Sequence, residues 1–332
     1  MARRKARIPQ GKKLQPAVKT MAFSLPIAAD STISLSQCAS LLNRRFYRAG
    51  LNWAVAGMTF FTTGVGSINI LKVPDTWIAS NAWEKGFHAW NDMNNEALES
   101  TESIKPRFTD FKVYMDNIHH AAGVGANALP IDSLLNPATP GTWDMSTVTF
   151  QTSTDTTNAT DYELIWTGGS YPGAAPGSGH DAVSLIEGYA SSRGLPQIRD
   201  PNVPDDAADV GPTATPENWI GSLLTEGSDQ HEDVLANMLV DNNQAPYPFE
   251  NDGTATDTQY PGGANQLPGL QIHDTLLVTA TTVGGKTTTG GFNAQGGLIR
   301  VRTQIDAGDV LCLVHLVPGD HRGYMCQPMQ DV

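Results

Sequence analysis

Several segments of the chain, most strongly those near its two ends, alternate apolar residues with small or polar ones, and this period of two predicts β-strands. The expected strands cover residues 18–35, 51–61, 67–73, 108–115, 143–152, 162–167, 270–283, 296–304 and 310–317. These nine segments are close to a set of eight strands, with helices and loops between them, which favours an all-β fold with helical insertions. Because strong strands lie at both ends, we expect a Greek-key or jelly-roll β-sandwich whose terminal strands pair.

Apolar residues spaced three or four apart predict helices between these strands. The expected helices cover residues 34–50, 75–100, 182–192, 216–224 and 229–239. We expect Ser34 or Ser36 to cap the first helix, Gly50 to end it, and Asp75 and Asp181 to cap the second and third. The second helix carries a broad apolar stripe, which more often indicates core or subunit packing than a ligand platform. The stripe comprises Trp77, Ala82, Trp83, Phe87, Trp90 and Met93.

Residues 168–269 differ in composition from the rest, with many glycine, proline, alanine, serine and aspartate residues. Connections this long are uncommon in compact domains and usually form binding or contact surfaces. We therefore expect one elaborated sandwich domain over residues 21–332, with insertions at about 168–269, rather than two domains. No internal repeat is visible, which weighs against propellers and solenoids.

Charge divides the chain into two parts. The 332 residues carry a formal net charge of −13, but residues 1–20 hold seven Lys and Arg residues and no acid. The other residues hold 14 Lys and Arg against 34 Asp and Glu, a net charge of −20. A body this acidic repels phosphate, so a nucleic acid would be bound locally by the basic N-terminal arm, residues 1–20.

The arm combines cations with proline and glycine and contains no aromatic residue before residue 20. Such a segment suits neutralisation of phosphates, with little reading of bases and a strong dependence on salt. Its candidate nucleic-acid-binding residues are Arg3, Arg4, Lys5, Arg7, Lys12 and Lys13. A second cationic set, Arg44, Arg45 and Arg48, could extend this surface, although its expected place in the last turns of a helix also complements the helix dipole. The arm could alternatively act as a nuclear import signal.

Signatures of catalysis are missing. The sequence contains no G-x-S-x-G, no G-x-x-x-x-G-K-[ST], no H-E-x-x-H and no dinucleotide-binding fingerprint. We therefore expect no enzymatic activity and no cofactor. No run of 18 apolar residues suggests a spanning helix, so we expect no membrane partner.

A metal site is not expected either. His119 and His120 follow Asp116, but adjacent residues of a strand point to opposite faces. The acidic residues at 200–209 lack the glycine and terminal glutamate of a calcium loop, so we interpret them as a solvated loop. Cys38, Cys312 and Cys326 match no zinc or disulfide pattern and are expected to be reduced thiols.

One arm would bind nucleic acid weakly, whereas many arms pointing into one closed shell would bind it avidly. An acidic exterior would keep such shells apart in solution. The sequence therefore favours a self-assembling homo-oligomer whose second partner is nucleic acid.

Four segments carry a resemblance to a known family: the arm ARRKAR…GKK, LSQCASLLNRRFYRAGLNWAVAG, WIASNAWEKGFHAW and the closing LVHLVPGDHRGYMCQPM. They resemble the capsid proteins of small environmental and marine viruses with circular single-stranded DNA genomes, most strongly over residues 1–120 and 295–330. The resemblance implies a single jelly-roll subunit, an interior Arg/Lys arm and a small icosahedral shell. From it we expect a virion protein that packages single-stranded DNA through the arm, and nuclear import by the arm would allow assembly in the host nucleus.

Two alternatives remain. A double jelly-roll major capsid protein of a membrane-containing phage would fit within 332 residues but needs two successive sets of eight strands. A carbohydrate-binding or adhesive β-sandwich would present exposed tryptophans to sugar rings.

Overall fold

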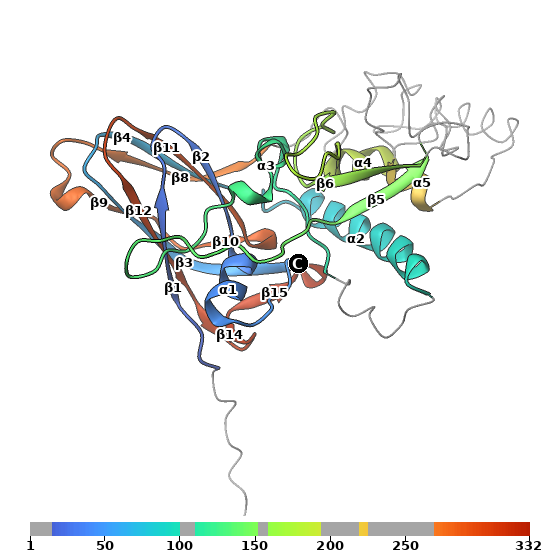
Figure 1. Ribbon diagram of the computed structural model, residues 1–332, viewed down its shortest axis with the longest axis horizontal. Helices are drawn as coiled ribbons and strands as arrows, with labels where there is room; N and C mark the ends of the chain where they lie inside the picture. Colours follow the sequence, from blue (N-terminus) through green and yellow to red (C-terminus); the bar gives the residue numbers. More distant parts are fainter. Residues whose placement is uncertain (1–14, 100–109, 152–158, 194–218, 225–268) are drawn as a thin grey trace, which may run out of the picture.

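The computed structural model describes residues 15–99, 110–151, 159–193, 219–224 and 269–332. Most of its regular elements are antiparallel β-strands, which form a sandwich-like fold with a few helices. Figure 1 shows the sandwich on one side of the molecule and a smaller group of helices and strands on the other. The expected all-β class with helical insertions is confirmed at this level.

Two sheets build the sandwich. The first has the order β1 (Thr20–Leu25), β12 (Val310–Leu316), β3 (Leu51–Thr62) and β10 (Phe292–Ala294), and β9 (Lys286–Thr288) and β15 (Cys326–Pro328) also pair with β3. The second has the order β2 (Asp30–Ser34), β11 (Leu298–Ile305), β4 (Gly66–Lys72) and β8 (Gln271–Val278). β1 and β12 are antiparallel, with Thr20 opposite His315 and Leu25 opposite Val310, so the two terminal long strands pair as expected.

Side chains from both sheets meet in one hydrophobic core. Every second residue of β12 is buried from Val310 to Leu316, as the period of two requires. Core members from the two sheets include Phe23, Phe60, Ile70, Val301 and Val314. Each large apolar side chain of this kind contributes about 1.5–3 kcal/mol when fully buried, and this burial holds the sheets together.

The corner between β1 and β2 divides the segment that the sequence predicts as one strand over residues 18–35. Pro26 follows β1 and has no N–H group to continue the ladder. Ala28 then adopts a φ of 51°, which turns the chain. The Thr303 hydroxyl on β11 donates to the Pro26 carbonyl at 2.6 Å and accepts from the Ala29 N–H at 3.3 Å. These contacts hold the corner on the second sheet.

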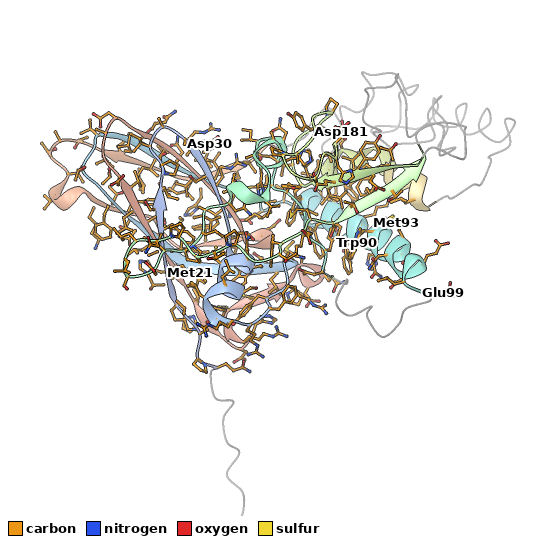
Figure 2. The ribbon with its side chains drawn as sticks, viewed as in Figure 1. Met21, Asp30, Trp90, Met93, Glu99 and Asp181 are labelled. Carbon is orange, nitrogen blue, oxygen red and sulfur yellow. The ribbon has the colours of Figure 1, made fainter. Side chains whose placement is uncertain are left out.

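A second hydrophobic cluster lies beside the sandwich. Its elements are α2 (Trp77–Ala97), β5 (Thr147–Gln151), β6 (Ala159–Ile165), β7 (Ala182–Ser184), α4 (Leu185–Arg193) and α5 (Trp219–Leu224). β5 is antiparallel and β7 parallel to β6. Figure 2 labels Met21 in the sandwich and Trp90 on α2, and so shows the separation of the two clusters. Gly86 permits close helix packing, because a Cβ there would lie 2.4 Å from Cδ2 of Leu185.

Short elements complete the described chain. They are α1 (Leu35–Asn43), α3 (Asn117–Ala122), β13 (Pro318–Gly319), β14 (Gly323–Tyr324) and the 3-10 turns η3 (Val124–Ala126), η6 (Val283–Gly285), η7 (Gln295–Gly297) and η8 (Met329–Asp331). β9, β10 and β13 to β15 were not expected from the sequence, because strands of two or three residues are too short to show a periodic pattern.

α1 begins as expected and ends earlier. The Ser34 hydroxyl caps it by accepting a hydrogen bond from the Gln37 N–H at 3.5 Å. Arg44 then adopts the left-handed conformation with φ 51°, which ends the helix well before Gly50. The expectation that Arg44, Arg45 and Arg48 lie in the last turns and complement the helix dipole is therefore wrong. All three are exposed residues of the segment after the helix.

The N-cap of α2 lies one residue later in the chain than expected. The Thr76 side chain accepts from the Ala79 N–H, whereas Asp75 forms an ion pair with Lys72. Trp77 is 53% exposed and so lies outside the buried apolar stripe of the helix. Trp83 is buried in the second cluster, as a packing role predicts.

Expectations for the region between β4 and β8 are met in part. The segment over 182–192 starts as β7, and the Ser184 hydroxyl, rather than Asp181, accepts from the Glu187 N–H in the first turn of α4. The strand expected over 108–115 is wrong for its described part, which forms only a bridge between Tyr114 and Ile165. The acidic loop at 200–209 and the helix expected over 229–239 lie outside the described residues.

Candidate nucleic-acid interface

The six cations of residues 3–13, Arg3, Arg4, Lys5, Arg7, Lys12 and Lys13, lie outside the described residues. The described chain starts at Gln15, and we call residues 15–19 the arm root. Lys19, the seventh cation of the arm, is part of it. The arm root fixes the place on the sandwich from which the arm extends.

Hydrogen bonds attach the arm root to α1 and to β14. The Val18 N–H donates to Oδ1 of Asn43 at 3.0 Å, and the Tyr324 hydroxyl donates to the Val18 carbonyl at 2.6 Å. The Lys19 ammonium donates to the Gly323 carbonyl and lies 4.7 Å from the centre of the Tyr324 ring. Figure 1 shows α1, β14 and the beginning of β1 at the same end of the sandwich.

Gly323 allows this attachment. Its φ is +102°, and a Cβ there would lie 2.7 Å from both Cβ of Ala17 and the carbonyl oxygen of Gln15. We expect Gly323→Ala to lower the free energy of unfolding by about 1–3 kcal/mol, because alanine strains the backbone and displaces the arm root. Urea unfolding measures this loss.

Gly290→Ala is the matched control for that substitution. At Gly290 a Cβ would have no atom within 4 Å, and the backbone φ is not positive, so the replacement should change the free energy of unfolding by less than about 0.5 kcal/mol. Equal effects of the two substitutions would contradict the close approach of the arm root to Gly323.

The structure brings Arg45, from the second cationic set of the sequence, into contact with the arm root. Arg45 donates from Nη1 to Oε1 of Gln15, and Arg44 and Arg48 flank it on the same exposed segment. Arg322, from the hairpin between β13 and β14, joins them. We call Arg44, Arg45, Arg48 and Arg322 the basic surface.

Arg322 holds the segment after α1 in place. Its Nη1 donates to the Phe46 carbonyl, and its own carbonyl accepts from the Tyr47 hydroxyl at 3.1 Å. Sequence reasoning missed Arg322 because it lies more than 270 positions from Arg45. The only signal was its place in a short D-H-R-G turn near the end of the chain.

The cations of the basic surface have no carboxylate partner among the described residues. By contrast, Lys72, Arg300 and Arg302 each contact an aspartate. Burial lowers the pKa of His321, and the charges of Arg322 and Arg45 lower it further. The His321 imidazole is therefore neutral at neutral pH. The positive charge of the surface comes from its four arginines, and guanidinium groups without carboxylate partners in the described chain are suited to an anionic ligand such as phosphate.

His119 and His120, considered above for metal binding, lie on α3 rather than on a strand and are buried. Nδ1 of His119 accepts from the Met115 N–H at 3.0 Å, and its Nε2 lies 2.7 Å from Oδ1 of Asn127. Nε2 of His120 lies 2.9 Å from a Glu163 carboxylate oxygen. These contacts join α3 to β6 and to the segment after η3. The described chain contains no group of three or more His, Cys, Asp or Glu residues placed to hold a metal ion.

The buried His119 predicts a pH dependence of stability. Burial lowers its pKa to about 4, so below pH about 6.5 the unfolded chain binds a proton that the folded chain does not. The free energy of unfolding should therefore be highest above pH 6.5 and fall towards pH 4, by about 3 kcal/mol from this residue. Urea unfolding between pH 7 and pH 4 should show a shallower pH slope for His119→Gln.

His88→Gln serves as the control for the pH slope, because the His88 side chain is 58% exposed. It should leave the slope as in the unsubstituted chain. An unchanged slope in His119→Gln would show that another group causes the acid sensitivity.

The three cysteines are free thiols, as the sequence indicates. Burial raises the pKa of Cys326 to about 12, so this thiol stays protonated at neutral pH. In the part of the chain that is described, no helix combines the length and apolarity needed to cross a membrane.

Compared with known proteins, the chain matches no protein-family model, no curated protein and no solved structure.

Proposed function

We propose that the chain is a capsid protein that self-assembles into a small icosahedral shell and packages single-stranded DNA through residues 3–13. In this proposal the sandwich is a single jelly roll. The strand order supports it, because β1, β3, β10 and β12 lie in one sheet and β2, β4, β8 and β11 in the other. β9 and β15 add to the first sheet, and the eight strands of the two main paths pass back and forth between the sheets, as is expected of two interlocked Greek keys.

The observation that carries the proposal is the separation of charge. An arm of seven cations precedes a body of net charge −20, and the arm root contacts Arg45, one of the four arginines of the basic surface. An inward-facing basic surface would neutralise packaged phosphates, while acidic surfaces elsewhere would limit aggregation of the shells. The role is structural, with no catalytic step and no cofactor, and places the chain in the virion, with assembly in the host nucleus.

Within the capsid class, the described strands favour the single jelly roll over the double one. Beyond the two sheets of the sandwich, the described residues contain a three-stranded sheet, β5 to β7, and the two-stranded hairpin β13–β14. These do not amount to a second set of eight strands.

The carbohydrate-binding alternative receives less support from the aromatic residues. Five of the seven tryptophans are buried: Trp53, Trp83, Trp90, Trp166 and Trp219. A sugar-binding face would need several of them in contact with solvent.

Sedimentation and electron microscopy of the full chain test the proposal against this alternative. We expect closed particles of uniform size, whereas a chain that stays dispersed at both low and high salt would overturn the proposal. A chain that starts at residue 15 should show no binding on a glycan array, because its tryptophans are mostly in the core. Strong glycan binding without particle formation would favour the adhesive function.

A further inference from the structure

Phe46 is an exposed aromatic residue within the basic surface. Its side chain is 50% exposed, although phenylalanine is normally among the most buried residue types. It lies between Arg45 and Arg48 in the chain, and Nη1 of Arg322 donates to its carbonyl. An exposed apolar ring on a segment that carries arginines without carboxylate partners in the described chain is suited to a ligand that is both flat and anionic.

The ring is supported from one side by neighbours that hold its position. Its centre lies 6.3 Å from the Trp143 ring, at an interplanar angle of 48°. The Lys112 ammonium lies 4.9 Å from the Trp143 ring centre and 6.0 Å from that of Phe46. Nζ of Lys112 lies 3.3 Å from Oδ2 of Asp110, and this ion pair holds the ammonium group in place. With its carbonyl bound by Arg322 as well, Phe46 presents its exposed part from a fixed position.

We propose that Phe46 is a stacking platform for an unpaired base, and that the arginines of the basic surface bind the phosphates on either side of that base. Aromatic side chains stack on any base, because every base has a π-face, and adjacent arginines follow the backbone. The arm lacks aromatic residues before residue 20, so it neutralises phosphate without contacting bases. Phe46 would supply the base contact at the point where the arm meets the body.

This inference rests on the proposed function and makes it more specific. A duplex hides the faces of its bases, so a stacking platform selects single strands, whereas the arm binds any polyanion. DNA and RNA share the unpaired base and the phosphate, so both should bind here.

The test compares ligands that differ only in their bases. The full chain is titrated at fixed salt with fluorescent dT20, with an abasic 20-mer of the same backbone, with U20 and with a 20-base-pair duplex. We expect dT20 and U20 to bind roughly 5- to 150-fold more tightly than the abasic strand, the range that corresponds to one stacked base. Per strand of nucleic acid, the duplex should bind no more tightly than the abasic 20-mer.

Variants of Phe46 separate stacking from simple apolar contact. Phe46→Leu keeps an apolar side chain without a flat ring and should abolish the preference for dT20 over the abasic strand, while Phe46→Trp should retain it. Trp77→Leu, which replaces the exposed tryptophan on α2, is the matched control and should leave the preference for dT20 over the abasic strand unchanged. Thermal unfolding verifies that each variant is folded.

Each outcome has a distinct meaning. Equal binding of dT20 and the abasic strand, or a preference that survives in Phe46→Leu, would overturn the stacking role and leave packaging by the arm intact. If neither strand bound at low salt, nucleic-acid binding by the whole protein would be refuted, and the stacking role with it.

Discussion

A chain in which the six cations of residues 3–13 are replaced by glutamine should form shells that are nearly empty of nucleic acid. For each phosphate that a cation neutralises, the logarithm of the binding constant falls by about 0.7–0.9 per tenfold increase in salt concentration. The loss of six cations per subunit therefore removes most of the electrostatic attraction between the arm and the nucleic acid. We expect the nuclease-protected nucleic acid per particle to fall by about tenfold or more. The sandwich should still fold, because its described contacts begin at Gln15.

A charge-preserving variant is the control for this result. Exchanging arginine for lysine and lysine for arginine at the same six positions retains the charge of the arm, and its particles should keep their nucleic acid. Full particles from the glutamine variant would mean that the arm is not the packaging element.

Asp116→Ala should lower the free energy of unfolding by about 3–5 kcal/mol, because it leaves a buried guanidinium without its closest partner. Oδ1 of Asp116 lies 2.6 Å from Nη2 of Arg300, whose exposed fraction is 1%. Asp30 is the only other carboxylate near Arg300 in the described chain, and it lies 3.9 Å from Nη1. Asp116 also accepts from the His119 N–H at 2.8 Å and so caps α3. Urea unfolding measures the loss.

A second substitution tests the cause. The double variant Asp116→Ala with Arg300→Met removes both charges, so it should recover a large part of the lost free energy of unfolding. A double variant that is less stable than Asp116→Ala alone would show that the buried charge is not the reason for the loss. The pair matters for the whole fold because it joins α3 to β11 of the sandwich.

The long strands and the first helix cap could be predicted from the sequence because their signals are local. Burial alternates over seven residues in β12 and in the first part of β3, and over shorter stretches in β4 and β11. Ser34 directly precedes an apolar periodic segment. Short strands such as β10 depend on their partners, since three residues cannot specify a strand alone. The early end of α1 was not predictable either, because it depends on a left-handed arginine at position 44 rather than on a glycine.

In the candidate interface, too, local features could be predicted from the sequence, whereas contacts between distant parts of the chain could not. The charge of the arm is a local property and could be found by counting along the sequence. The association of Arg45 with Gln15, and of Arg322 with Phe46, joins parts of the chain that are far apart in sequence. The misinterpretation of Arg44, Arg45 and Arg48 arose because a local role at a helix end was available to explain them.

Nuclease protection of assembled particles tests the central claim most directly. The full chain is expressed, the product is treated with nuclease, and the particles are imaged by electron microscopy before their nucleic acid is extracted and digested with a single-strand-specific nuclease. We predict closed shells of one size that contain protected single-stranded nucleic acid. A chain that remains a dispersed monomer at low and high salt, with no protected nucleic acid, would contradict the proposed function.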